Sequence, residues 1–332
     1  MKISVLGDGA WGSAIAQLLS LNKHEVALWG PFPDYIKEMD KLKTNSRFLP
    51  QITFDKNIIF TPSLKKAVNN TEIIVLALPT QYIRQLLTNL KPFFDSQKHI
   101  ILNLAKGIET TTLKRISEIV QETLGDTHYS VLSGPNHAEE VVKKFPAATV
   151  IAAKDSKVRQ TVQSIFTNNN YRVYSSDDVA GVELGGSLKN VYAIGAGVVD
   201  GMKLGDNSKA ALLTRSIAEM SRLGKALGGK FETFSGLSGI GDLIVTCYSK
   251  HSRNRFVGNR LGAGLKLKKI LLELNMSVAE GITTTKSAYH LAEIASIDTP
   301  IINELFNTLY HDKSPKESIN DLMTRSATTE IY

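Results

Sequence analysis

The sequence has little of what disulfide bonds and metal sites require. Cys247 is the single cysteine among 332 residues, so no disulfide can form within the chain. The 7 histidines fall into no metal-ligand pattern such as H-E-x-x-H, and there is no C-x-x-C motif. Nothing in the sequence therefore supports a metal site, and we expect a reaction that needs none.

Long hydrophobic runs are also lacking. The most apolar segment, Val191–Val199, lies between Lys189 and Asp200 and is far shorter than the roughly 20 residues that a membrane helix needs. The apolar N-terminal run stops at Gly7, which is too early for the hydrophobic region of a signal peptide. We expect no membrane span and a cytoplasmic location.

No tract of one charge stands out, although the formal net charge is +7. Residues 1–185 hold 21 Lys and Arg against 18 Asp and Glu, and residues 186–332 hold 18 against 14. An excess spread this evenly does not indicate a nucleic-acid partner. A mild positive balance favours small anionic ligands, and a phosphorylated metabolite is the expected partner.

What the sequence does contain is an alternation of short β-branched runs with helical segments, which predicts a parallel sheet covered by helices. The expected strands are Ile3–Leu6, Glu25–Trp29, Ile73–Leu78, Ile100–Leu104, Ser130–Leu132 and Thr149–Ala152. After about residue 178 helical patterns take over, at Val179–Asp200, Ser208–Leu227, Leu267–Leu274, Ile282–Ala295 and Ile301–Tyr310. We expect a doubly wound Rossmann-type α/β domain over residues 1–180 and an α-helical substrate-binding domain over 181–332.

A glycine-rich loop, Gly7-Asp8-Gly9-Ala10-Trp11-Gly12, lies directly between the first strand and a helix. In this G-x-G-x-x-G pattern Gly7 permits a tight turn, Gly9 lets the backbone approach a pyrophosphate, and Gly12 lets the helix pack on the strand. The alternative is a chance glycine cluster in a turn. Trp29-Gly30-Pro31, at the end of the second strand, offers neither the acid typical of NAD sites nor a base for NADP, so the choice between NAD and NADP stays open.

Polar residues follow three further strands, at Pro79-Thr80-Gln81, Lys106-Gly107 and Ser133-Gly134-Pro135-Asn136. Ligands of such sheets bind where strand ends converge. For Lys106 the alternative is an ordinary solvated lysine.

The helical half contains a candidate acid-base residue. Lys189 lies on a glycine-rich, apolar helix, where burial would lower the pKa of its ammonium and suit it to proton transfer. The alternative is a lysine that reaches out to solvent. Asp242, after a glycine-rich bend, could pair with Lys189 or could instead act as an N-cap for the segment that follows it. Ser252-Arg253-Asn254-Arg255 opens a helix and has the composition of a phosphate site, or of a plain exposed helix start.

These blocks, in this order along essentially the whole chain, resemble the bacterial-type NAD(P)-dependent glycerol-3-phosphate dehydrogenase family. The resemblance is carried by Gly7–Gly12, Ala105-Lys106-Gly107, Ser133-Gly134-Pro135, Gly185–Asn190, Gly239–Leu243, Ser252–Arg255 and Val278-Ala279-Glu280-Gly281. It implies hydride transfer between NAD or NADP and dihydroxyacetone phosphate, with glycerol 3-phosphate as the product used in glycerophospholipid synthesis. It also implies a homodimer.

The resemblance further implies roles for individual residues. Lys189 would be the proton donor and acceptor, and Asp242 would orient it. The substrate would be surrounded by Lys106, Gly134, Asn136, Asp242, Ser252, Arg253 and Asn254, and the cofactor by Gly7, Gly9, Ala10, Trp11, Gly12, Lys106, Ala138, Arg253, Val278 and Glu280. Asn136 departs from the family's usual Ser or Thr, and Pro31 departs from its usual polar or basic residue.

Two other functions are compatible with the same pattern. One is a related two-domain hydroxyacid dehydrogenase that acts on a sugar-acid phosphate, which a panel of substrates would distinguish. The other is a catalytically idle NAD-binding scaffold. The scaffold gives no reason for Lys189, Asp242 and the Arg253-Asn254 pair beside a complete cofactor loop.

The glycine loop generates the first prediction. A side chain at Gly9 would occupy the space that a pyrophosphate needs, so Gly9→Val should abolish NADH binding and leave the fold intact. Calorimetric titration with NADH, together with circular dichroism of the same preparation, checks both parts. Unchanged NADH affinity in the folded variant would remove the cofactor assignment.

Overall fold

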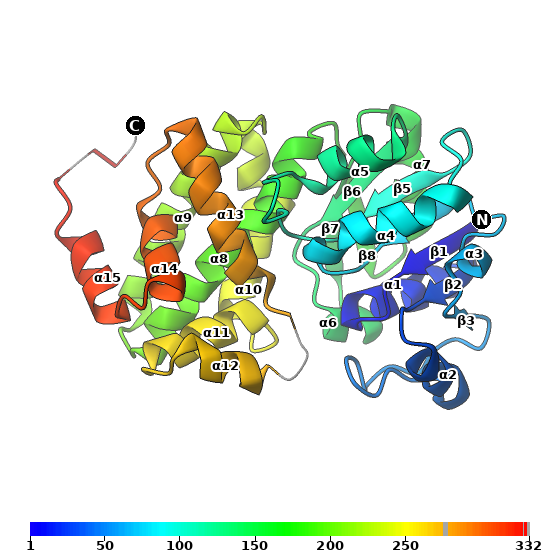
Figure 1. Cartoon of the computed structure of the whole chain (residues 1–332), viewed down its shortest axis with the longest axis horizontal. Coiled ribbons are helices and arrows are strands. Elements are labelled where there is room, and N and C mark those ends of the chain that lie inside the picture. The colour runs from blue at the N-terminus through cyan, green and yellow to red at the C-terminus, as the bar shows by residue number, and fades with distance from the viewer. Residues whose placement is uncertain (275–277, 328, 331–332) are drawn as a thin grey trace.

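The structure, a computed structural model, describes residues 1–274, 278–327 and 329–330. Its described part holds one eight-stranded sheet in the order β3-β2-β1-β4-β5-β6-β7-β8. The strands are β1 (Lys2–Leu6), β2 (Glu25–Trp29), β3 (Ile59–Thr61), β4 (Ile73–Leu76), β5 (Ile100–Asn103), β6 (His128–Ser133), β7 (Ala147–Ala152) and β8 (Tyr171–Ser176). Figure 1 shows this sheet in one half of the molecule and a bundle of helices in the other.

The expected parallel sheet is present with two differences. The pair β6–β7 is antiparallel, with Val131 opposite Ala152, whereas the other strand pairs are parallel. Strands β3 and β8 were not expected from the sequence. β3 has 3 residues, and β8 is an edge strand in which buried and exposed residues alternate, so neither carries a long apolar run.

Helices cover both faces of the sheet, as the doubly wound pattern predicts. One core joins the sheet to α1 (Ala10–Leu21), α2 (Pro33–Leu42), α6 (Ala138–Val142) and α7 (Ser156–Phe166). A second core joins the opposite face to α3 (Leu64–Ala67), α4 (Ile83–Leu90) and α5 (Ile116–Leu124). β1 is the switch point, because β2 pairs on one side of it and β4 on the other, and ligands of such sheets bind at the carboxyl ends beside this point.

Helices make up the half of the chain that follows β8. They are α8 (Val179–Gly201), α9 (Asp206–Ala226), α10 (Asp242–Tyr248), α11 (Arg253–Gly262), α12 (Leu267–Glu273), α13 (Glu280–Ala295), α14 (Pro300–Tyr310) and α15 (Pro315–Met323). Of these, α10 and α15 were not expected. In the part of the chain that is described, none of these helices combines the length and apolarity of a membrane span.

Helix α8 lies at the centre of the helical half, and residues 181–199 of it are all buried. Its small residues allow α11 to approach backbone to backbone. A Cβ on Gly197 would lie 2.1 Å from the carbonyl oxygen of Arg255, and one on Gly258 would lie 1.8 Å from that of Ile194. The glycines of this helix therefore allow close backbone packing between α8 and α11.

This packing predicts opposite effects for two nearby glycines of α8. Gly197→Ala should lower the free energy of unfolding by about 1–3 kcal/mol, because its Cβ would push against the backbone of α11. Gly195→Ala is the matched control: its Cβ would meet only side-chain methyl groups, of Leu212 at 3.4 Å and Leu305 at 3.5 Å, and it should raise stability by up to about 1 kcal/mol through helix propensity. Urea denaturation measures both. Equal effects would contradict the backbone contact.

Candidate functional site

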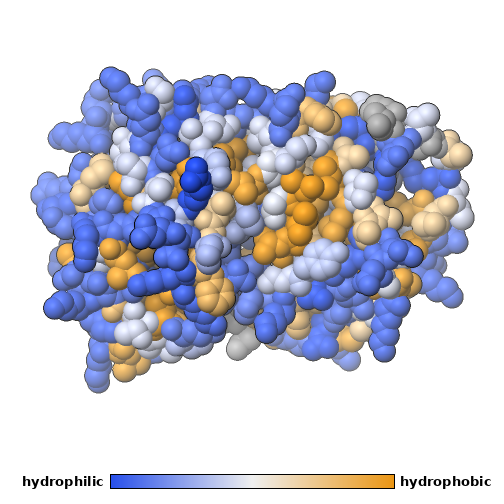
Figure 2. All heavy atoms as spheres, turned by 180° about the vertical axis from the view of Figure 1, so that it is seen from behind, coloured by the Kyte–Doolittle hydropathy of each residue, from blue (hydrophilic) through white to orange (hydrophobic). Residues whose placement is uncertain are grey.

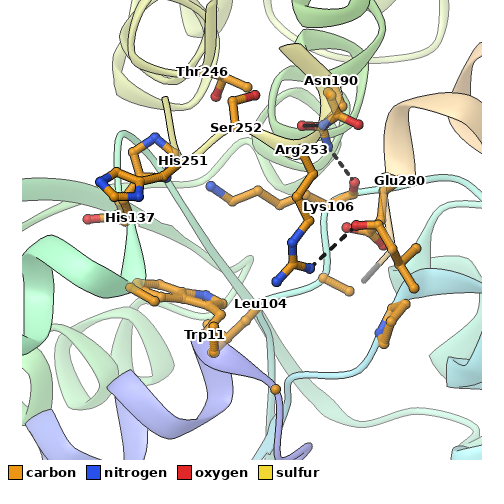
Figure 3. A pocket seen from close by; sticks show the side chains of 18 of the residues that line it. Trp11, Leu104, Lys106, His137, Asn190, Thr246, His251, Ser252, Arg253 and Glu280 are labelled. Atoms are coloured by element: carbon orange, nitrogen blue, oxygen red, sulfur yellow. Dashed lines mark hydrogen bonds between the residues drawn. The ribbon is translucent and has the colours of Figure 1, made fainter. Parts of the chain in front are cut away.

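A pocket opens where the carboxyl ends of the strands face the helical half, and side chains from both halves line it (Figure 3). The cofactor loop and the ends of β4, β5 and β6 form one side, while α8, α10, α11 and the start of α13 form the other. The lining residues are Gly9, Ala10, Trp11, Ala77, Leu78, Pro79, Leu104, Ala105, Lys106, Asn136, His137, Ala138, Glu139, Lys189, Asn190, Asp242, Thr246, His251, Ser252, Arg253, Asn254, Val278 and Glu280.

The three glycines of the cofactor loop have different structural roles. Gly7 has a φ of +139° and a Cβ there would lie 2.5 Å from the carbonyl oxygen of Ala77. A Cβ on Gly12 would lie 2.0 Å from the carbonyl oxygen of Gly7, which closes the turn onto the helix. Gly9 differs, since no atom lies within 4 Å of the Cβ position. Its open side faces the pocket, which fits a ligand that approaches the backbone.

Several buried polar atoms around the pocket have no hydrogen-bond partner. They include Nε1 of Trp11 and both amide atoms of Asn136. Unpaired buried polar groups are costly, and a bound ligand is a common reason for their presence. Together with the open side of Gly9, they fit a dinucleotide and a polar substrate side by side.

At the centre of the pocket one carboxylate joins two lysines. Oδ2 of Asp242 lies 2.5 Å from Nζ of Lys106, and its Oδ1 lies 3.0 Å from Nζ of Lys189. The three side chains are 2%, 15% and 8% exposed, in that order. Solvated lysines are thereby excluded for both positions. Capping does not explain Asp242 either, because Gly241 occupies the N-cap position of α10 and the carboxylate oxygens are taken by the lysines.

Charge and burial act against each other in this triad. Burial alone would raise the pKa of Asp242, but the Lys106 and Lys189 ammonium groups outweigh it and hold that pKa below its usual range. Burial lowers the pKa of Lys189, with Asp242 opposing the change and Lys106 adding to it. Lys189 is thus an ammonium that releases its proton more readily than an exposed lysine.

Hydrogen bonds fix the orientation of each lysine. Nζ of Lys106 donates to the carbonyl oxygen of Gly134 at 3.0 Å, and Nζ of Lys189 donates to Oγ1 of Thr246 at 2.7 Å. Thr246 in turn donates to the carbonyl oxygen of Asp242 at 2.6 Å. Thr246 was missed from the sequence, although it follows Asp242 by four residues on one helix and so shares its face.

Two asparagines tie the helices of this wall together. Asn190 donates to the carbonyl oxygen of Lys106 at 3.0 Å and accepts from Nδ2 of Asn254 at 2.9 Å. Oδ1 of Asn254 accepts from the backbone N–H of Gly281 at 2.9 Å. Although Asn254 lines the pocket, both atoms of its amide bond to protein, and this network holds α8, α11 and α13 in register around Lys106.

The start of α11 forms the mouth of the site. Ser252 is its N-cap, with Oγ accepting from the backbone N–H of Arg255 at 3.2 Å. Arg253 extends from this first turn into the pocket toward Trp11 (Figure 3), and its guanidinium donates to the carbonyl oxygen of Val278 at 3.4 Å. Arg255 turns away and pairs with Asp200 at 2.6 Å. One arginine and a helix N-terminus therefore face the pocket, as an anion site requires.

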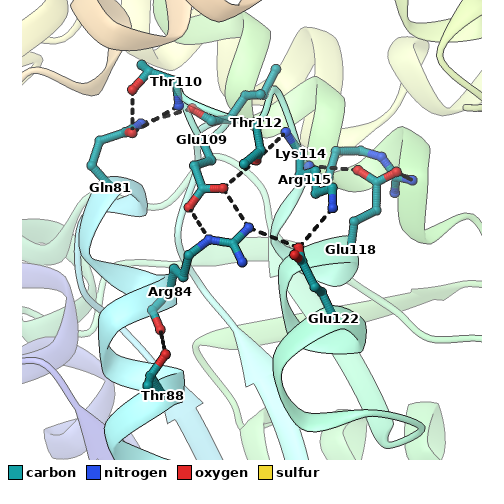
Figure 4. A network of polar contacts seen from close by, with 11 residues as sticks. Gln81, Arg84, Thr88, Glu109, Thr110, Thr112, Lys114, Arg115, Glu118 and Glu122 are labelled. Atoms are coloured by element: carbon teal, nitrogen blue, oxygen red, sulfur yellow. Dashed lines mark hydrogen bonds and ion pairs between the residues drawn. The ribbon is translucent and has the colours of Figure 1, made fainter.

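The loop that carries Lys106 is held in place by ion pairs with α4 and α5 (Figure 4). Arg84 of α4 forms two hydrogen bonds of 2.8 Å to the carboxylate of Glu109 and also pairs with Glu122 at 3.1 Å. Glu280 accepts from the N–H and the hydroxyl of Thr80 at 2.8 and 2.9 Å, which ties α13 to the end of β4. The Glu109 contacts thus hold the loop that carries Lys106, and the Glu280 contacts hold the start of α13, which lines the pocket.

The structure brings most of the expected site residues to this one pocket. Gly7, Gly12 and Gly134 do not line it; Gly7 and Gly12 shape the cofactor loop, and Gly134 supplies the carbonyl oxygen for Lys106. His137 and His251 also line the pocket, with ring centroids 6.0 Å apart. No motif in the sequence pointed to these two histidines.

Comparison with known proteins places the chain in a family. The family model described as the NAD-dependent glycerol-3-phosphate dehydrogenase N-terminus matches residues 2–159, and the model of the C-terminus matches residues 178–320. The chain is similar to two proteins named glycerol-3-phosphate dehydrogenase [NAD(P)+]. One, from Thermoanaerobacter sp., is 48% identical over 100% of this chain and 99% of its own. The other, from Staphylococcus haemolyticus, is 46% identical over 99% of both.

A solved structure agrees with these relatives. The crystal structure of glycerol-3-phosphate dehydrogenase from Coxiella burnetii matches with a TM-score of 0.94 and 34% identity, over 98% of this chain and 99% of the other. The overall fold, a sheet followed by a helical half, is thus common to both. Because the two family models together span nearly the whole sequence, this chain belongs to the NAD-dependent glycerol-3-phosphate dehydrogenase family.

Proposed function

We propose that the chain interconverts dihydroxyacetone phosphate and sn-glycerol 3-phosphate with NADH or NADPH. The observation that carries this function is the buried Lys106–Asp242–Lys189 triad in a pocket that also contains the cofactor loop and Arg253. Bound NADH or NADPH supplies the hydride that reduces the C2 carbonyl. An assay of NADH and NADPH oxidation across a panel of ketone phosphates tests the assignment.

Lys189 is the proposed proton donor. Its ammonium faces the pocket, and as the C2 oxygen gains negative charge during reduction, Nζ donates a hydrogen bond and then the proton to it. Such a donor stabilises the developing alkoxide more than the ground-state carbonyl. Asp242 holds Lys189 in place by its ion pair, and Lys106 keeps the carboxylate neutralised after the proton has left.

The substrate phosphate is proposed to bind at the start of α11. Free N–H groups of the first turn and the Arg253 guanidinium both favour a phosphate there. Asn136, whose amide atoms are buried and unpaired, faces the same cavity and is a further candidate contact. This arrangement would leave the C2 carbonyl near Lys189.

We propose a nucleotide-binding part over residues 1–180, a substrate-binding part over 181–332, a cytoplasmic location and a homodimer. Figure 2 shows apolar residues gathered on a face of the helical half, and a partner subunit is one kind of molecule that covers such a surface. The alternative substrate, a sugar-acid phosphate, gains no support from the named relatives.

The proton-donor role predicts the effect of removing the ammonium. Lys189→Met should keep NADH binding and lower kcat by about 100-fold or more, the range of general acid catalysis. Lys106 still neutralises Asp242 in this variant, so the fold should persist. Lys209→Met is the matched control, because Lys209 is equally buried but pairs with Asp200 at 2.9 Å outside the pocket. It should keep kcat. Near-normal kcat in Lys189→Met would refute the assignment.

The lowered pKa of Lys189 also predicts the pH dependence. Reduction needs the ammonium form, so kcat for reduction should fall as pH rises through the pKa of Lys189, which burial places below that of a free lysine. Oxidation of glycerol 3-phosphate needs the neutral amine and should rise over the same interval. Steady-state profiles in both directions give the result, and parallel profiles would contradict it.

If Arg253 binds the substrate phosphate, removing its side chain should act mainly on KM. Arg253→Ala should raise the KM for dihydroxyacetone phosphate by about 10- to 100-fold, since a charge-assisted hydrogen bond to phosphate contributes roughly 1.5–3 kcal/mol. Arg255→Ala, two residues along and paired with Asp200, should leave that KM nearly unchanged. If Arg253→Ala weakens phosphorylated and unphosphorylated ketones equally, the phosphate binds elsewhere.

A further inference from the structure

The end of β2 lacks a side chain of its own for the adenosine ribose, and a carboxylate from the neighbouring loop takes that position. A Cβ built on Gly30 would lie 2.3 Å from Oδ2 and 2.5 Å from Cγ of Asp8. The Asp8 carboxyl group therefore occupies the space in which a side chain at position 30 would begin. In dinucleotide-binding folds this is where an acid at the end of the second strand meets the ribose 2′-hydroxyl.

Asp8 is buried and has one carboxylate oxygen without a hydrogen-bond partner, as a ligand-binding group would. The residue is 6% exposed, and its Oδ2 has no hydrogen-bond partner. Burial raises the pKa of Asp8, and a hydrogen bond to its own backbone and the charge of Arg47 oppose that rise. A carboxylate that served only to hold the loop would use both oxygens within the protein. Here one oxygen is left for another donor.

A hydrogen-bond network around Asn45 holds the backbone of Asp8 in place. The carbonyl oxygen of Asp8 accepts from Nδ2 of Asn45 at 2.8 Å, and the same amide donates to Oγ of Ser13 at 2.7 Å. Tyr35 donates to Oδ1 of Asn45 at 2.5 Å, and the Arg47 guanidinium lies 4.1 Å above the Tyr35 ring. These contacts join the glycine loop to the segment after α2 and hold the backbone of Asp8, whose carboxyl group lies beside Gly30.

We propose that Asp8 is the coenzyme-specificity residue of this chain, accepting hydrogen bonds from the adenosine ribose hydroxyls and disfavouring a 2′-phosphate. The inference rests on the proposed dinucleotide site and assigns the task usually given to the end of β2. Asp8 should favour NADH over NADPH. A negative charge beside the 2′ position accepts a hydrogen bond from a hydroxyl and repels a phosphate.

The test compares the binding of two coenzymes to one isosteric variant. Dissociation constants for NADH and NADPH are measured by calorimetry in the full chain and in Asp8→Asn. We expect NADH to bind about 10-fold or more weakly in Asp8→Asn, while NADPH binds as well as before or better, so that the NADPH/NADH ratio of dissociation constants falls at least 10-fold. Asp34→Asn, a fully exposed carboxylate on α2, is the control and should leave the ratio unchanged.

A second variant moves the acid instead of removing it. Asp8→Ala with Gly30→Asp places a carboxylate at the end of β2 once the Asp8 carboxyl group is gone and Cδ1 of Ile36, 2.8 Å from the new Cβ, has moved aside. This variant should restore the preference for NADH that Asp8→Ala alone loses. A ratio that stays constant in Asp8→Asn, or an equal loss of both coenzymes, would overturn the proposal. If instead the unaltered chain binds neither coenzyme, the proposed function itself fails.

Discussion

The site depends on a single buried carboxylate, that of Asp242, which forms ion pairs with two ammonium groups. A lysine buried without a partner would lose its charge or destabilise the fold, and this pocket holds two lysines within reach of Asp242. Lys106 comes from the loop after β5, Lys189 from the middle of α8, and Asp242 from the start of α10. The sheet and the helical half must therefore meet at this point for any of the three charges to be tolerated.

Helix α8 makes that meeting possible. Its glycines let α11 approach to backbone contact, and Asn190 and Asn254 then connect α8, α11 and α13 to the carbonyl oxygen of Lys106. The same helix places Lys189 at the pocket. Helix α8 therefore contributes both to the packing of the helical half and to the chemistry of the site. A methyl group added at Gly197, far from Lys189, would press on α11 and so act on the geometry of the site.

Much of the fold and of the site could be predicted from the sequence, because these features depend on local sequence patterns. The glycine loop, the parallel strands and the burial of Lys189 among small and apolar neighbours each follow from short segments. Long-range choices could not be predicted. Asp242 is separated from Lys106 by 136 positions, and its local context suited a helix cap as well as an ion pair. The antiparallel β6–β7 pair and the edge strand β8 depend on which neighbours the folded sheet offers.

Helix α8 also has a consequence for how the chain is made. Residues 181–199 are all buried, so the helix has no solvent-exposed face over this length, and the α11 segment that covers it at Gly197 follows roughly 50 residues later. At about 5–20 residues per second, the ribosome delivers that cover several seconds after α8 has left it. During this interval the helix has incomplete neighbours, so the side of α8 around Gly197 stays uncovered until α11 has been synthesised.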